Sequence, residues 1–173
     1  MDPTPSPYLF HAFEVSYFSA KVRPALRAKG LWHTELRADV REVMRLTGLP
    51  FIPVVETPRG EVWQDSTEIL ARLEERHPEP ALFPRSPVQR MAAQLVELYV
   101  DEFATAPAMH YRWGSEEGAA SARARFAAMM GDADLAKKAA DRMAAARFAL
   151  GATDDAGPAL EAHARELLDA LGA

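Results

Sequence analysis

Two sequence patterns meet near residue 78, and their order constrains the fold more than any other feature. Before this point, short apolar runs typical of buried strands alternate with segments whose apolar residues recur at helical spacing. After it, apolar residues recur only at helical spacing. An α/β half followed by an all-α half indicates two domains.

The α/β half is predicted to have the order β-α-β-α-β-β-α. Its expected elements are residues 8–13, 17–29, 32–37, 39–46, 51–56, 61–64 and 67–76. The later half is predicted to hold helices at 88–113, 118–130, 132–150 and 159–171. Prolines are frequent between the halves, which indicates a linker. We therefore predict an α/β domain over residues 1–78, a proline-rich linker over 79–87 and an all-helical domain over 88–173.

Composition excludes several classes of function. A chain of 173 residues with 49% hydrophobic and 26% charged residues can bury a core, and its net charge of −5 argues against nucleic-acid binding. The absence of cysteine excludes disulfides, cysteine redox chemistry and thiolate metal ligands. Scattered histidines predict no metal site. Without a leader pattern or an apolar run of the ~20 residues that span a bilayer, we expect a soluble cytoplasmic protein with no membrane partner.

Two places in the α/β half have residues that suit a helix N-terminus. Ser16 lies between the first predicted strand and the first predicted helix, and Asp65 and Ser66 precede the last helix of this half. Such residues can be plain caps. A helix N-terminus with spare N–H groups is also an anion site, so both interpretations can hold at once.

Basic residues gather on the first predicted helix. They are Lys21, Arg23, Arg27 and Lys29. Charge runs of this kind usually mark a solvated helix face, and we interpret the cluster in that way.

Three successive motifs resemble motifs of the glutathione S-transferase superfamily, and they follow one another in the same order as in that family. Residues 14–23, followed by Lys29-Gly30-Leu31, are similar to its strand-to-helix corner, with serine in place of the active-site cysteine. Residues 52–55, Ile-Pro-Val-Val, resemble its strand that carries a cis-proline, and residues 64–73 resemble its Glu-Ser-x-x-Ile helix start. The resemblance implies a thioredoxin-like N-terminal domain that binds glutathione, followed by an all-α C-terminal domain. The helical half is short for the superfamily, which leaves its completeness open.

The resemblance also implies roles for individual residues. Glutathione would be the co-substrate, and Ser16 would donate a hydrogen bond to its thiolate, with Tyr17 as the rival donor. The remaining glutathione-binding candidates are Ser19, Ile52, Pro53, Gln64, Asp65 and Ser66. A pocket for an electrophile is expected between the domains, and its candidates on the predicted helix 88–113 are Tyr99, Phe103, His110, Tyr111 and Trp113. Aromatic residues at helical spacing are more often core, and that alternative stays open.

The function that follows is binding of glutathione and activation of its thiol for transfer to a small hydrophobic electrophile. One alternative is a non-catalytic binding or oligomerisation module, because fold does not imply function. Another is a glutathione-dependent isomerase or dehalogenase. The family pattern predicts a homodimer through helix 66–77 and the start of helix 88–113.

Overall fold

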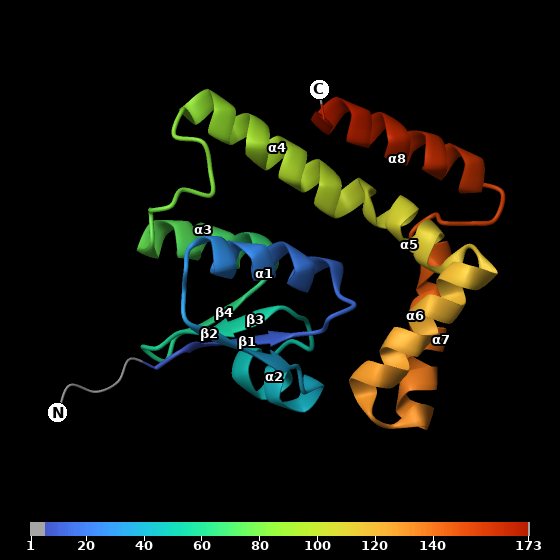
Figure 1. Ribbon diagram of the computed structural model, residues 1–173, viewed down its shortest axis with the longest axis horizontal. Coiled ribbons are helices and arrows are strands. Elements are labelled where there is room, and N and C mark those ends of the chain that lie inside the picture. The colour runs from blue at the N-terminus through green and yellow to red at the C-terminus, as the bar shows by residue number, and fades with distance from the viewer. Residues whose placement is uncertain (1–5, 173) are drawn as a thin grey trace. The chain divides into compact units, whose positions relative to one another are not determined.

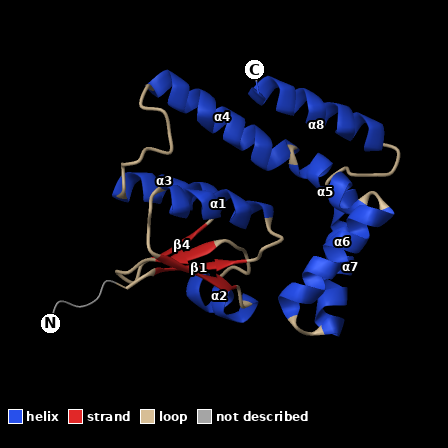
Figure 2. Ribbon diagram, in the orientation of Figure 1, coloured by secondary structure: helices blue, strands red, loops and turns tan. Residues whose placement is uncertain are grey.

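The computed structural model of the protein describes residues 6–172. The chain divides into two compact units, Met1–Pro84 and Arg85–Ala173. Among the described residues, every strand belongs to the first unit, and the second is entirely helical (Figure 2). The predicted fold class, an α/β thioredoxin-like unit followed by a helical unit, is confirmed.

The first unit is built on a mixed four-stranded sheet of order β2-β1-β3-β4. Its strands are β1 (Tyr8–Ala12), β2 (His33–Arg37), β3 (Val54–Glu56) and β4 (Val62–Gln64). Strand β1 pairs in parallel with β2, whereas β3 is antiparallel to both β1 and β4. Strand β3 is shorter than the predicted residues 51–56, because Pro53 has no N–H to donate to a ladder.

Three helices cover the two faces of this sheet. They are α1 (Tyr17–Ala28), α2 (Val40–Thr47) and α3 (Ser66–Arg76). Helices α1 and α3 lie side by side on one face and α2 lies on the other (Figure 1). The larger core lies under α1 and α3, where Phe10, Leu26, Trp63 and Ile69 are almost fully buried. The smaller core lies under α2 and is centred on Val43.

Lys29 contradicts the predicted solvated face of α1. Its side chain is fully buried, and its ammonium forms an ion pair with Glu74 at 2.7 Å. The same nitrogen donates to the carbonyl oxygens of His77 and Pro80. Lys29 follows the last residue of α1 and reaches across to the end of α3 and the segment after it. The sequence pattern could not reveal this, because all three partners lie 45 or more residues away.

The second unit contains five helices within the described residues. They are α4 (Pro87–Phe103), α5 (Thr105–Trp113), α6 (Glu116–Met130), α7 (Ala133–Ala149) and α8 (Gly157–Gly172). The predicted single helix over 88–113 is therefore wrong. Pro107 cannot donate a hydrogen bond to the carbonyl of Phe103, so the helix ends there. Pro107 is instead the third residue of α5, where an N–H has no partner within the helix.

The core of the second unit is formed mainly by α5, α6 and α7. Met109, Trp113 and Phe126 are its large buried side chains, and the rings of Trp113 and Phe126 lie 6.1 Å apart. Buried alanines, among them Ala136 and Ala140, supply the α7 side. No helix within residues 6–172 combines the length and apolar character that crossing a membrane requires.

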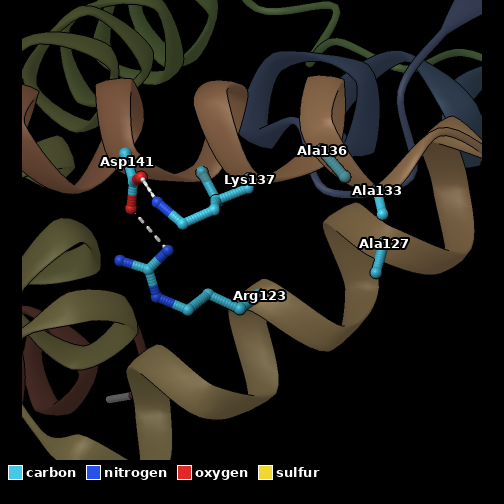
Figure 3. A pocket seen from close by; sticks show the side chains of 7 residues that line it. Arg123, Ala127, Ala133, Ala136, Lys137 and Asp141 are labelled. Carbon is cyan, nitrogen blue, oxygen red and sulfur yellow. Dashed lines mark hydrogen bonds and ion pairs between the residues drawn. The ribbon is translucent and has the colours of Figure 1, made fainter.

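A groove of about 510 Å³ runs between α6 and α7 and is lined mostly by alanines (Figure 3). Charged side chains stand at one end of it. Asp141 accepts from Lys137 at 2.8 Å and from Arg123 at 2.6 Å. These two hydrogen bonds, that of Lys137 first, lower the pKa of the Asp141 carboxyl. Small side chains let α6 and α7 pack closely, and the ion pair between Arg123 and Asp141 links the two helices at one end of the groove. We therefore interpret the groove as part of the packing between these two helices.

Candidate functional site

One edge of the sheet brings together the three segments singled out in the sequence. Strands β1 and β4 are parallel to each other, because each is antiparallel to β3. His11, Val54 and Gln64 lie in one row across the sheet, since His11 pairs with Val54 and Val54 pairs with Gln64. The chain beyond this row therefore leaves β1 towards α1, enters β3 from Pro53 and leaves β4 towards α3. The two helix N-termini and the Pro53 segment meet at the same edge.

Ser16 caps the helix that follows β1. Its backbone is extended, with φ −81° and ψ 126°, and its Oγ accepts the backbone N–H of Ser19 at 3.2 Å. The predicted N-cap is confirmed. Ser16 is half-buried. A hydroxyl that accepts in this way still carries its own proton, which it can donate to an anion. Tyr17, the first residue of α1, is half-buried as well.

Ser19 has a different environment. It is fully buried, and its Oγ accepts the backbone N–H of Phe13 at 3.4 Å. This bond joins the end of the β1 segment to the first turn of α1. Ser19 therefore braces the corner that carries Ser16, and its buried hydroxyl is poorly placed to contact a ligand directly.

The segment before β3 is held by Gln64. The Gln64 amide nitrogen donates to the carbonyl oxygens of Leu49 at 3.2 Å and Phe51 at 2.7 Å. Ile52 is half-buried, Pro53 is fully buried, and the peptide bond between them is cis. Gln64 thus fixes the loop that leads into Pro53, so its amide nitrogen has a structural partner within the protein.

Asp65 has an unusual backbone conformation. Its φ is +77° and its ψ is 131°, and within residues 6–172 it is the one non-glycine residue with positive φ. Such a conformation costs about 1–3 kcal/mol and is found preferentially at functional sites. The exposed Asp65 carboxylate accepts the backbone N–H groups of Thr67 at 2.9 Å and Glu68 at 3.2 Å through Oδ1. Ser66 is 3% exposed, so its hydroxyl is largely withdrawn from solvent.

Comparison with known proteins shows which proteins the first unit resembles. Residues 10–81 match the family described as glutathione S-transferase, N-terminal domain. Over these residues, which make up less than half of the chain, the protein resembles the glutathione S-transferases. Curated proteins give no match.

Solved glutathione S-transferases share the fold. One from Methylobacterium radiotolerans, in complex with glutathione sulfonate, is 26% identical with a TM-score of 0.56; the match covers 97% of this chain and 91% of that one. A rice enzyme in complex with glutathione is 25% identical with a TM-score of 0.55, over 71% of this chain and 60% of that one. One from Rhodospirillum rubrum is 20% identical with a TM-score of 0.55, over 60% and 51%. The chain thus spans only 51–60% of the length of the last two proteins.

The residues predicted for the electrophile pocket do not share one environment. On α4, Tyr99 and Phe103 stack with ring centroids 5.2 Å apart and are 39% and 61% exposed. On α5, Trp113 is 6% exposed and packs in the core, and Tyr111 is 52% exposed. The core alternative therefore describes Trp113, and the electrophile pocket stays a prediction.

His110 has a different environment from Tyr99 and Phe103. Its side chain is 15% exposed and its Nε2 lies 3.3 Å from an oxygen of Glu161 on α8. A Cβ added to Gly157 would come within 2.9 Å of the His110 ring, so α8 approaches this ring closely. His110 therefore packs between helices of the second unit.

Two polar neighbours of the candidate residues were not predicted from the sequence. His163 on α8 places its Nε2 3.3 Å from the Tyr99 hydroxyl. Lys21 on α1 donates to the Thr67 hydroxyl at 3.0 Å, at the start of α3. Lys21 lies four residues after Tyr17 and therefore on the same face of the helix. This spacing could have indicated from the sequence that Lys21 lies near the candidate site. Within the described part of the chain, no three His, Asp or Glu side chains are grouped to hold a metal ion.

Proposed function

We propose that this chain binds glutathione and activates its thiol for transfer to a small hydrophobic electrophile. The observation that carries the proposal is the shared sheet edge, where the capped N-terminus of α1 and the strained, acid-capped N-terminus of α3 meet beside Pro53. The family match over residues 10–81 and the glutathione-bound relatives support it.

The proposed role of Ser16 follows from its cap geometry. Its oxygen accepts the N–H of Ser19, so the hydroxyl proton can point away from the helix and towards the ligand sulfur. A thiolate there would also meet the positive end of the α1 dipole. Lowering a thiol pKa by one unit requires about 1.4 kcal/mol, which one charge-assisted hydrogen bond can supply. Tyr17 stays the rival donor.

The remainder of glutathione would lie along the sheet edge towards α3. The backbone of Ile52 beside Pro53 would pair with the peptide part of the ligand. Asp65 would hold the γ-glutamyl ammonium and the first turn of α3 with Ser66 its carboxylate. Gln64 would act indirectly by fixing the loop before Pro53. Ser19 would act indirectly by fixing the turn between β1 and α1 that carries Ser16.

Calorimetric titration with glutathione tests this assignment. We expect wild-type protein to bind glutathione, and bound glutathione to show a lowered thiol pKa by the ultraviolet absorbance of its thiolate. In Ser16→Ala the thiol pKa should rise by about one unit, the loss of one charge-assisted hydrogen bond. Ser121→Ala, an exposed serine on α6, is the matched control and should change neither quantity. Absence of glutathione binding by the wild type would contradict the proposal.

Turnover separates the enzyme from a non-catalytic module. Conjugation of glutathione to 1-chloro-2,4-dinitrobenzene, dependent on Ser16, would identify a transferase. Glutathione binding without conjugation of any electrophile, together with a defined oligomer, would identify the binding or oligomerisation module instead.

We further propose a homodimer that uses α3 and the start of α4. No residue of α4 is buried, and its Val88, Met91 and Leu95 are 71%, 57% and 59% exposed. Exposed apolar side chains grouped in this way are typical of a surface that contacts another protein chain. Sedimentation at micromolar concentration tests the proposal, and a monomer would contradict it.

A further inference from the structure

We propose that Lys21 is a specificity-determining residue for the γ-glutamyl group, with its ammonium paired to the ligand α-carboxylate. This inference rests on the proposed glutathione function and adds to it a cation at the start of α3. The site itself is supported by the family match and by glutathione-bound relatives, and only the role of Lys21 is new.

The structure places the ammonium of Lys21 and the carboxylate of Asp65 next to the same residue, Thr67. Lys21, in the second turn of α1, donates from Nζ to Oγ1 of Thr67 at 3.0 Å across 46 residues of sequence. The backbone N–H of the same Thr67 is held by Oδ1 of Asp65 at 2.9 Å. An ammonium and a carboxylate therefore flank the first turn of α3, next to the site edge.

This arrangement complements an amino-acid head group. The free end of a γ-glutamyl group is a zwitterion, with an ammonium and a carboxylate on one carbon. Asp65 alone would attract the ammonium but repel the carboxylate, and the partial charge of a helix N-terminus compensates only in part. Lys21 supplies the full opposite charge that the carboxylate requires.

The burial of Ser66 strengthens the need for a second partner. The residue that the family pattern assigns to the carboxylate is only 3% exposed. Lys21 is partly buried, so its charge is less screened than that of a fully exposed lysine. We infer that Lys21 makes the stronger contact with the ligand carboxylate.

The test combines two ligands with three forms of the protein. The ligands are glutathione and 4-aminobutyryl-cysteinyl-glycine, which lacks only the α-carboxylate. The proteins are wild type, Lys21→Met and the control Arg27→Met, which removes an exposed cation in the last turn of the same helix. Affinities are measured by calorimetry at low and high salt.

We expect Lys21→Met to weaken glutathione binding about tenfold, the loss of one charge-assisted hydrogen bond. Its affinity for the analogue should equal that of the wild type, which also shows that the variant is folded. Arg27→Met should bind both ligands as the wild type does, and Lys21→Arg should retain most of the affinity for glutathione. The salt dependence of glutathione binding should decrease in Lys21→Met only.

Two results overturn the inference in distinguishable ways. If wild type binds glutathione and Lys21→Met binds it equally well, or loses affinity equally for both ligands, Lys21 does not recognise the carboxylate and the proposed function stands. If wild type binds neither ligand, the proposed function fails and this inference fails with it.

Discussion

Replacing Lys29, the C-cap of α1, by methionine should destabilise the first unit more than the removal of any single charge on α1 itself. Lys29→Met keeps an unbranched apolar chain in place but removes the ammonium that serves Glu74 and the carbonyls of His77 and Pro80. The Lys29 side chain is 0% exposed and that of Glu74 is 12% exposed. The carboxylate would therefore be left charged, nearly buried and without its cation.

The expected loss follows from that burial. Removing one partner of a buried ion pair costs about 3–5 kcal/mol, mostly because the other charge stays buried. Water can replace the ammonium at the carbonyl of the exposed Pro80, so we add nothing for that group. A loss of this size is a large part of the total stability of about 5–15 kcal/mol typical of a domain. For a loss of about 3 kcal/mol, the urea midpoint should fall by about 1–3 M.

Urea unfolding followed by circular dichroism measures this shift. Arg45→Met is the matched control, because Arg45 forms an ion pair with Glu42 between side chains that are 66% and 41% exposed. We expect that variant to keep the wild-type midpoint, since exposed pairs contribute little. Adding Glu74→Gln to Lys29→Met should recover part of the loss by removing the stranded charge. Equal midpoints for Lys29→Met and Arg45→Met would refute the reasoning.

Acid dependence gives a second readout of the same pair. Burial raises the pKa of the Glu74 carboxyl, but the hydrogen bonds from Lys29 and from the backbone N–H groups of Leu82 and Phe83 together lower it below its ordinary value. In wild type, the contribution of Glu74 to stability is thus present above that value and lost as pH falls through the lower folded pKa. In Lys29→Met burial should prevail and raise the pKa of Glu74. The stability difference between the two proteins should then narrow from pH 7 to pH 4, and a constant difference would contradict this account.

Two further substitutions test features of the backbone. Asp65→Gly should raise stability by about 1 kcal/mol, because glycine adopts positive φ without strain and retains most of a cap, yet it should weaken glutathione binding; a loss of stability would contradict the strain assigned to this residue. Gly114→Ala should lower stability by about 1–3 kcal/mol, because the new Cβ would lie 2.6 Å from the His110 carbonyl oxygen, whereas Gly172→Ala meets open space and serves as the neutral control in thermal unfolding.

Much of the fold follows from local sequence pattern. The seven elements of the first unit were predicted in the right order, because most of them have an apolar run or an apolar helix face and are bounded by cap or turn residues. The break between α4 and α5 was missed because the apolar spacing continues across it, although Pro107 was an available signal for the end of a helix. Helix pattern alone could not decide whether 88–113 was one helix or two.

The candidate site was predictable only where it depends on local chemistry. Ser16 and Asp65 were recognised as caps, since capping depends on the residue and the next three positions. The burial of Ser19 and the contact between Lys21 and Thr67 depend on how α1 packs against the sheet and α3. Packing between distant segments leaves no periodic trace in the sequence.

The parallel run of β1 and β4 has a consequence for how a ligand would act on the chain. The segments at the sheet edge, near residues 16, 53 and 65, are held together by the paired strands between them and by the packing of α1 against α3. An opening that unpairs these strands and also separates α1 from α3 would leave no binding surface. A bound molecule would therefore stabilise the first unit against every opening that disrupts this edge, and amide protons that exchange through such openings should slow their exchange even where they lie far from the edge.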